Sequence, residues 1–143
     1  MKNIFKPIPK EFEPKRDNRF VVEFPESFEI APWIIQSITM PKLTNDKWEN
    51  IELSMMDPIG PSASKSTIKL IDFCKKNKPG FFKKNKNLFT ISISLLDATG
   101  VGVEKWTIDI KELISVDFGN LDYREATLKT VKIILKPGDC RLN

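Results

Sequence analysis

The chain contains no histidine, only two cysteines and no long run of apolar residues. Without histidine it can form neither a Ser–His or Cys–His catalytic pair nor a histidine-bearing metal site, and the commonest general base is missing. Cys74 and Cys140 are too far apart in sequence for a redox pair and too few for a zinc site, so both are expected to be free thiols. Most hydrolase mechanisms are therefore excluded.

Signals for membrane insertion and export are equally scarce. No stretch approaches the roughly 18 apolar residues that a membrane-spanning helix needs, and residues 1–10 carry no apolar signal region. We expect a protein without a membrane segment that is made and kept in the cytoplasm. Its 143 residues fit one domain, and 41% hydrophobic with 29% charged residues is the composition of a chain that folds.

Two weaker signals for chemistry have plainer interpretations. Gly100 and Gly102 form a G-x-G, but a strand pattern follows them, whereas a phosphate-binding loop needs a helix N-terminus there, so a turn is expected. Acidic residues are plentiful, yet the sequence singles out no pair for glycoside chemistry. The sequence predicts no catalytic residue, no metal and no cofactor, and hence no enzyme.

The positive charge of the chain is concentrated in two places. The net charge is +4, but residues 75–86 carry six lysines and no acid, and residues 1–19 carry six basic and three acidic side chains. The basic loop consists of Lys75, Lys76, Lys78, Lys83, Lys84 and Lys86. Beside Phe81 and Phe82, these groups would suit a nucleic-acid backbone and its bases. Alternatively, this is a solvated loop that follows a helix and tucks its phenylalanines into the domain.

Residues 1–18 differ in character from the rest of the chain. Pro7, Pro9 and Pro14 forbid a long helix and favour an extended arm. Its sizeable apolar side chains are Phe5, Ile8 and Phe12. Either the arm is a disordered tail, or these spaced side chains dock on a neighbouring molecule. We predict two parts, an extended N-terminal arm over residues 1–18 and a β domain over residues 19–143.

From residue 19 onward the sequence has the short alternating runs of half-buried strands. The cleanest is residues 88–96. There Phe89, Ile91, Ile93 and Leu95 alternate with Thr90, Ser92 and Ser94. A hairpin loop is predicted over residues 97–102. Further strands are predicted at residues 19–24, 33–39, 48–56, 103–110, 114–118 and 127–136.

One helix is predicted, from a cap at Ser62 or Ser64 to about Asn77. Its apolar stripe comprises Ile68, Ile71 and Cys74, with Leu70 and Phe73 beside them. About seven strands, without strand–helix alternation and without a repeat, indicate a mainly β fold. We expect a two-layer β-sandwich or partial barrel with the helix at its side. The outermost strands of such a sheet carry unpaired backbone N–H and C=O groups, which need hydrogen-bond partners.

Several short segments, taken in order, resemble one protein family. Residues 18–24 followed by 38–41 look like its first hairpin, residues 48–57 like its third strand, and residues 66–75 like its helix. The C-terminal passage is the most telling part, with residues 106–110, 116–123 and 127–135. From about Asn18 to Leu135 the chain resembles the tail-tube proteins of contractile-tailed bacteriophages, which are similar in fold to the tube protein of the type VI secretion system.

The resemblance implies a structural virion protein. In the family each subunit lends strands to a shared inter-subunit β-barrel, six copies close a ring, and stacked rings form the conduit for DNA. Such closure removes exposed sheet borders. The implied partners are copies of the same chain, other phage tail or neck proteins, and DNA in transit. The implied location is the tail or neck of a virion that is assembled in the host cytoplasm. The competing interpretation is a nucleic-acid-binding module that uses the basic loop.

Candidate residues follow from the resemblance and the strand pattern. Thr90, Ser92 and Ser94 are the first candidates to face a water-filled lumen. Asn50, Glu52 and Ser54 are the second candidates. The predicted inter-subunit strand contributes Leu128, Val131, Ile133, Ile134 and Leu135. Its mixture of apolar residues on both faces is expected of a strand that is covered on both sides.

One departure from the family concerns stacking. The family's loop between the second and third strands is commonly long and reaches into the adjacent ring, whereas only residues 42–47 separate these strands here. A specialised ring at the neck or baseplate end of a tail would need fewer contacts between rings. Docking of Phe5, Ile8 or Phe12 on a neighbour would replace the missing loop.

Overall fold

The computed structural model describes residues 13–77 and 87–143, which are mainly β. The arm residues Phe5, Ile8 and Phe12 and four lysines of the basic loop, Lys78, Lys83, Lys84 and Lys86, lie outside the described residues. The strands are β1 (Phe20–Glu23), β2 (Ile35–Ile38), β3 (Leu43–Thr44), β4 (Lys47–Trp48), β5 (Ile51–Met56), β6 (Phe89–Leu96), β7 (Gly102–Asp117) and β8 (Thr130–Leu142). The helices are the short 3-10 turns η1 (Glu26–Phe28) and η2 (Pro32–Ile34) and the α-helix α1 (Ala63–Lys76).

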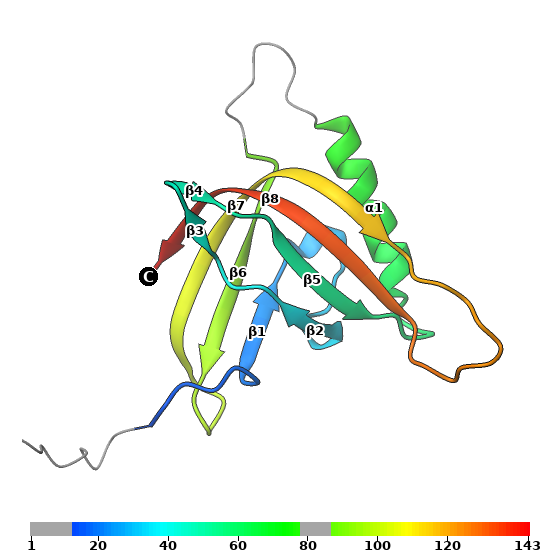
Figure 1. Cartoon of the computed structure of the whole chain (residues 1–143), viewed down its shortest axis with the longest axis horizontal. Helices are drawn as coiled ribbons and strands as arrows, with labels where there is room; N and C mark the ends of the chain where they lie inside the picture. Colours follow the sequence, from blue (N-terminus) through cyan, green and yellow to red (C-terminus); the bar gives the residue numbers. More distant parts are fainter. Residues whose placement is uncertain (1–12, 78–86) are drawn as a thin grey trace, which may run out of the picture.

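Six strands form one antiparallel sheet in the order β1-β6-β7-β8-β5-β2. The sheet curls so that its border strands β1 and β2 come back toward each other without pairing (Figure 1). The 3-10 turn η2, directly before β2, packs against β1 across this gap, which we call the seam. The predicted β-sandwich or partial barrel with a helix at its side is confirmed.

The resemblance-based first hairpin is wrong, because β1 and β2 do not pair. β1 pairs with β6 and β2 pairs with β5, which puts the two strands at opposite borders of the sheet. The connection between them is no tight turn: it contains η1 and η2, and Glu29 between them has a left-handed φ of 56°. Phe28, Ile30 and Ile34 are buried, so this connection crosses the core and carries the chain from one border to the other.

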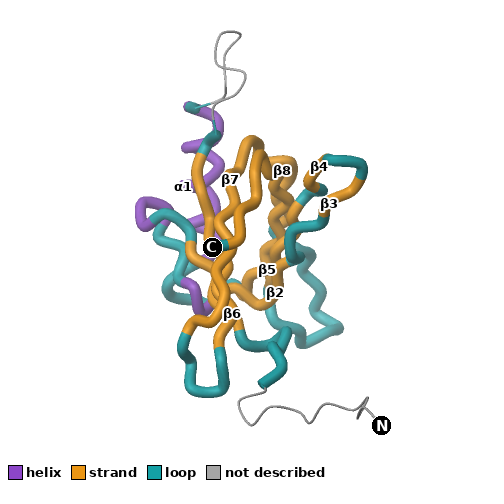
Figure 2. Tube along the Cα trace, turned by 90° about the vertical axis from the view of Figure 1, so that its left-hand side faces the viewer, coloured by secondary structure: helices purple, strands orange, loops and turns teal. Residues whose placement is uncertain are grey.

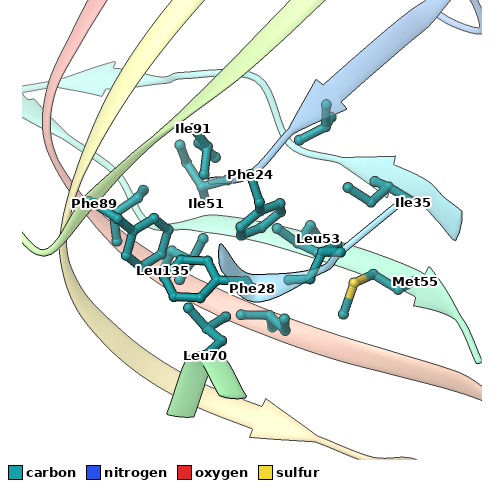
Figure 3. Packing of buried hydrophobic residues seen from close by; sticks show 14 of the residues in the cluster. Phe24, Phe28, Ile35, Ile51, Leu53, Met55, Leu70, Phe89, Ile91 and Leu135 are labelled. Carbon is teal, nitrogen blue, oxygen red and sulfur yellow. The ribbon is translucent and has the colours of Figure 1, made fainter. Parts of the chain in front are cut away.

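The core lies inside the curled sheet (Figure 3). Alternation along the strands sends every second side chain inward. Ile51, Leu53 and Met55 of β5 and Ile91 and Ile93 of β6 are therefore buried almost completely. The ring of Phe28 meets those of Phe73 on α1 and Phe89 on β6 edge-on, with ring centroids 5.1 and 5.2 Å apart. These rings join the helix and the crossing connection to the sheet.

The two C-terminal strands are longer than the sequence indicated. Residues 103–110 and 114–118, predicted as two strands, belong to one strand, β7, which runs from 102 to 117. Its pairing with β8 shifts register near Ile110 and again near Leu113. Such shifts bend a strand and re-aim its side chains, which breaks the simple alternation that sequence patterns rely on. β8 likewise continues past its predicted end at residue 136, through Pro137, to Leu142.

The helix begins where the sequence predicts, and Leu70 and Cys74 of the predicted stripe are buried, but the buried face is shifted away from Ile68 toward Ala63, Ser66 and Thr67. The Ser62 hydroxyl accepts a hydrogen bond from the backbone N–H of Lys65 at 3.2 Å, so Ser62 is the N-cap. The buried face is Ala63, Ser66, Thr67, Leu70 and Cys74, whereas Ile68 is 47% exposed. Burial of the two hydroxyls is tolerated because each finds an acceptor. Thr67 Oγ1 donates to the carbonyl of Ala63 at 2.7 Å, and Ser66 Oγ donates to that of Glu29 at 2.9 Å.

Residues 42–47, predicted to be a short loop, lie in a small ribbon formed by β3 and β4. Its turn is Asn45-Asp46, and both residues have positive φ, as a two-residue hairpin turn of the primed type requires. The ribbon and α1 lie on opposite sides of the sheet (Figure 2). Leu43 in the ribbon is 56% exposed, so the ribbon presents an apolar side chain to its surroundings.

Asp57, just after β5, joins three segments of the chain. Its Oδ1 accepts hydrogen bonds from the backbone N–H groups of Ala63 and Ser64 at 3.0 and 3.2 Å, at the start of α1. Its Oδ2 binds the Ser64 hydroxyl and, at 2.9 Å, the ammonium of Lys129 just before β8. Burial acts to raise the pKa of Asp57, but the hydrogen bonds from Ser64 and Lys129 outweigh it and lower the pKa from 3.8 to about 2.

Stability should therefore fall in acid through Asp57. A carboxyl group whose pKa is lowered by folding stabilises the fold above its unfolded pKa, and that contribution is lost as the pH falls from about 4 to about 2. We expect Asp57→Asn to lower the free energy of unfolding at neutral pH by about 2 kcal/mol and to flatten its fall between these pH values. Urea unfolding at several pH values measures both. Asp46→Asn, in the exposed β3–β4 turn, is the matched control and should change neither.

Candidate assembly surface

The first lumen candidates lie on the outer face of the sheet. Thr90, Ser92 and Ser94 alternate with the buried Phe89, Ile91 and Ile93 of β6. Across the ladder, Ser92 faces Thr107 and Ser94 faces Lys105 on β7. A shallow cavity of about 270 Å³ lies beside Thr90 and Ser92. The three residues thus share a polar outer row, and their exposure to a lumen stays a prediction.

A buried carboxylate anchors this polar row. Asp109 of β7 accepts a hydrogen bond from Thr90 Oγ1 at 3.0 Å. Its two carboxylate oxygens also accept hydrogen bonds from the guanidinium of Arg141, at 2.6 and 3.2 Å. Asp109 is only 9% exposed, so it needs these partners to stay ionised. The hydrogen bonds from Arg141 lower the pKa of Asp109, against the effect of burial and together with the bond from Thr90. β6, β7 and β8 are therefore cross-linked on their outer face.

The second lumen candidates are not part of that row. Glu52 and Ser54 point outward from β5, opposite Ile134 and Lys132 of β8, and Asn50 lies exposed just before β5. Because β7 and β8 separate β5 from β6 in the sheet, the two sets of candidates form separate rows. The sequence gives alternation along one strand, whereas the position of that strand in the sheet depends on distant pairing.

The strand predicted to contact another subunit, β8, is an interior strand of this chain's own sheet. Val131, Ile133 and Leu135 are fully buried; all three pair with β5, and Ile133 and Leu135 also pair with β7 on the other side. Ile134 is partly exposed on the outer face, and Leu128 lies before the strand and is 69% exposed. Any contact of these residues with a second copy stays a prediction, and Leu128 is the one most open to it.

The seam is not indicated by the strand patterns of the sequence. A cavity of about 470 Å³ lies there, lined on one side by Phe20 and Val21 and on the other by Pro32, Trp33, Ile35 and Gln36. Trp33 is 62% exposed, which is unusual for so large an apolar ring. The sequence had placed Trp33 in a strand. Its position directly after Pro32, where a strand ladder is unfavourable, was the available signal that it lies elsewhere.

The long connection between β7 and β8 also exposes large apolar side chains. Leu121 is 88% exposed, and Tyr123 is fully exposed. Ile59 is also fully exposed, in the turn whose Asp57 binds Lys129 at the other end of this connection. Gly119, at the start of the connection, has a φ of +84°, and a Cβ at this position would lie 3.1 Å from the carbonyl oxygen of Thr130. Position 119 therefore favours glycine. Three large apolar side chains are therefore exposed on these two loops.

The described part of the basic loop is small. Lys75 and Lys76 are exposed in the last turn of α1, where positive charge suits the negative end of the helix. The other four lysines lie outside the described residues. Lys75 and Lys76 therefore have a structural explanation, and nucleic-acid binding by the loop stays a prediction.

Both cysteines are buried as free thiols, as the sequence predicted. Burial raises the pKa of Cys74 and of Cys140 to about 11, and the charges of Asp139 and Asp109 add to the effect at Cys140. Across residues 13–77 and 87–143, no three metal-binding side chains come together. Nor is any helix in that part of the chain long and apolar enough to cross a membrane.

Buried thiols of raised pKa should be unreactive in the folded protein, because the thiolate is the reacting species. We expect a chromogenic disulfide reagent at neutral pH to titrate almost no thiol in the native protein and both thiols in urea. Absorbance of the released product measures this. Rapid labelling of either cysteine without denaturant would contradict the burial of that residue.

No family model and no curated protein matches the chain. Solved structures do match it over nearly its whole length. A chain of the sheath-tube complex of an extracellular contractile injection system (PVC), in the extended state, matches 94% of this chain with 93% of its own, at 16% identity and a TM-score of 0.62. A chain of the tube-terminating cap of the anti-feeding prophage matches 100% of this chain with 99% of its own, at 16% identity and a TM-score of 0.64.

A third match is a chain of the anti-feeding prophage baseplate, which was solved with sixfold symmetry. It matches 92% of this chain with 97% of its own, at 15% identity and a TM-score of 0.58. At such low identity these likenesses show the fold. The chain has a tail-tube-like fold, as the order of its sequence segments had indicated.

Proposed function

We propose that this chain is a structural, non-catalytic subunit of a contractile tail-type particle, in which copies of it form a ring. In the finer form of the proposal, six copies surround a passage for DNA in the tail or neck of a virion, as a tube ring or as a specialised ring near the neck or baseplate. The fold similarity to chains of sheath-tube, baseplate and cap assemblies supports the coarser part.

The observation that carries the ring is the open seam. The sheet is nearly closed, yet within the described residues β1 and β2 each lack a paired strand on one side. Unpaired strand borders attract other strands, and natural proteins cover or pair them. A head-to-tail contact between identical copies closes into a ring when the rotation between copies permits it.

The exposed apolar side chains support assembly independently. Trp33 in the seam and Leu121 and Tyr123 on the β7–β8 connection would be covered in an assembly and are exposed in the single chain. The polar outer row at Thr90, Ser92 and Ser94 suits a wet passage, since short hydroxyl side chains offer little to hold a transported molecule.

Sedimentation and negative-stain microscopy of the purified full-length chain, across a wide range of concentrations, test the ring. Rings with a central opening are expected. Monomers throughout that range would overturn the proposal. A parallel salt titration with double-stranded DNA should show weak binding; tight binding that falls steeply with salt would favour the nucleic-acid-binding module.

A further inference from the structure

We propose that the seam of one copy receives residues 1–12 of a neighbouring copy, which add as a strand along the open border of β1. This inference rests on the proposed function, because it requires that copies assemble. The arm of one copy and the seam of the next would form one contact between copies.

The free border of β1 faces the seam. The carbonyl of Arg19 accepts a hydrogen bond from the N–H of Leu96 at 2.9 Å, so Arg19 directs its backbone groups toward β6. Alternate residues of a strand direct their backbone groups to the same side, so Val21 and Glu23 also face β6. Phe20 and Val22 direct theirs the other way, where no strand of the described chain pairs with them.

Beside this border lies space for side chains. The 470 Å³ cavity between β1 and the segment that includes Trp33 is open to the surface, and its lining is mainly apolar, with one polar side chain on each side, Asn18 and Gln36. An added strand would place alternate side chains there while its backbone pairs with Phe20 and Val22. Backbone pairing would supply affinity, and filling of the cavity would supply specificity.

The sequence of the arm fits a border that has room for one strand. Pro7 and Pro9 have no N–H, so the side of an extended arm to which both belong cannot form a ladder. Lys6, Ile8 and Lys10 keep their donors on the opposite side. The arm can therefore pair with one strand border and leaves its outer border blocked, which is how edge strands are protected from further pairing.

Residues 13–15, which follow directly after the arm segment 1–12, are bound to the β6–β7 hairpin and not to the chain's own seam, which favours a neighbouring copy as the arm's acceptor. The backbone N–H of Ala98 donates to Glu13 Oε1 at 3.0 Å, and Lys15 Nζ lies 2.9 Å from Glu104 Oε1. Both partners belong to the β6–β7 hairpin, on the side of β1 away from the seam (Figure 1). Residues 13–15 are thus held on the side of β1 that faces away from the chain's own seam.

A mixed disulfide experiment tests the contact between copies. Full-length Ile8→Cys protein and full-length Gln36→Cys protein are co-expressed and mildly oxidised, and covalent dimers are counted on a non-reducing gel. Gln36 is exposed and lines the seam cavity, so its replacement should not disturb the fold. Ile8→Cys co-expressed with Glu52→Cys, on the outer face of β5, is the matched control, and the unaltered chain controls for its buried thiols.

We expect about tenfold more covalent dimer with Gln36→Cys than with Glu52→Cys, because contact raises the effective concentration of one thiol at the other. Equal yields from the two pairs, in samples that form rings under the microscope, would overturn the arm contact and leave the ring intact. Monomers in every sample would overturn both.

Discussion

Replacing Phe20 with proline is expected to abolish assembly while leaving the chain folded. The N–H of Phe20 points into the seam, where the structure gives it no partner strand, and proline removes that donor. A border strand tolerates proline on its open side, since none of its own ladder bonds is lost. Sedimentation should show a monomer at concentrations where the unaltered chain forms rings, and circular dichroism should show an unchanged β signal.

Two control variants separate the possible causes. Phe20→Ala shortens the same side chain but keeps the donor, so it should assemble better than Phe20→Pro. Val21→Pro removes a donor that faces β6, opposite Ser94, and should destabilise the fold by about 3 kcal/mol. Normal assembly of Phe20→Pro would mean that the β1 border takes no part in contacts between copies.

The second large effect is expected at Ile133, on the stability of the single chain. Its side chain is fully buried, and β8 lies there between Leu53 of β5 and Val116 of β7. Ile133→Ala should lower the free energy of unfolding by about 3 kcal/mol through lost burial and the cavity left behind. Thermal unfolding of the dilute chain should then shift downward by on the order of 10 °C.

Leu128→Ala is the matched control for Ile133→Ala. Leu128 is 69% exposed, so its truncation should change stability by less than about 0.5 kcal/mol. A loss of assembly without a loss of stability would place Leu128 in a contact between copies. If Ile133→Ala instead weakened assembly and spared thermal stability, the burial of Ile133 within its own chain would be contradicted.

Local sequence signals predicted the elements that depend on near neighbours. The alternation in β6 and the cap at Ser62 are set by residues within a few positions, and both appear where expected. The proposed hairpin of β1 with β2 failed because strand pairing is non-local. Phe28 and Ile34, buried in the connection, decide that the chain crosses the core at this point.

The candidate site was less predictable for the same reason. Thr90, Ser92 and Ser94 could be placed on an outer face from alternation alone, but their link through Asp109 to Arg141 depends on the register of β6, β7 and β8. The seam needs the order of all six strands before Phe20 and Trp33 can be seen to line one cavity. Leu121 and Tyr123 gave a weaker signal, as apolar residues in a polar stretch that follows Gly119.

The pairing of β7 with β8 also determines how the domain unfolds. β1 and β6 connect to the rest of the sheet only through β7, and β5 and β2 only through β8. Neither pair can detach as a stable unit of its own, since isolated two-stranded sheets are marginal in water. The domain should open as a single cooperative unit, and the amide hydrogens of Ile108 and Cys140, which face each other in this ladder, should exchange with deuterated solvent only through that global event.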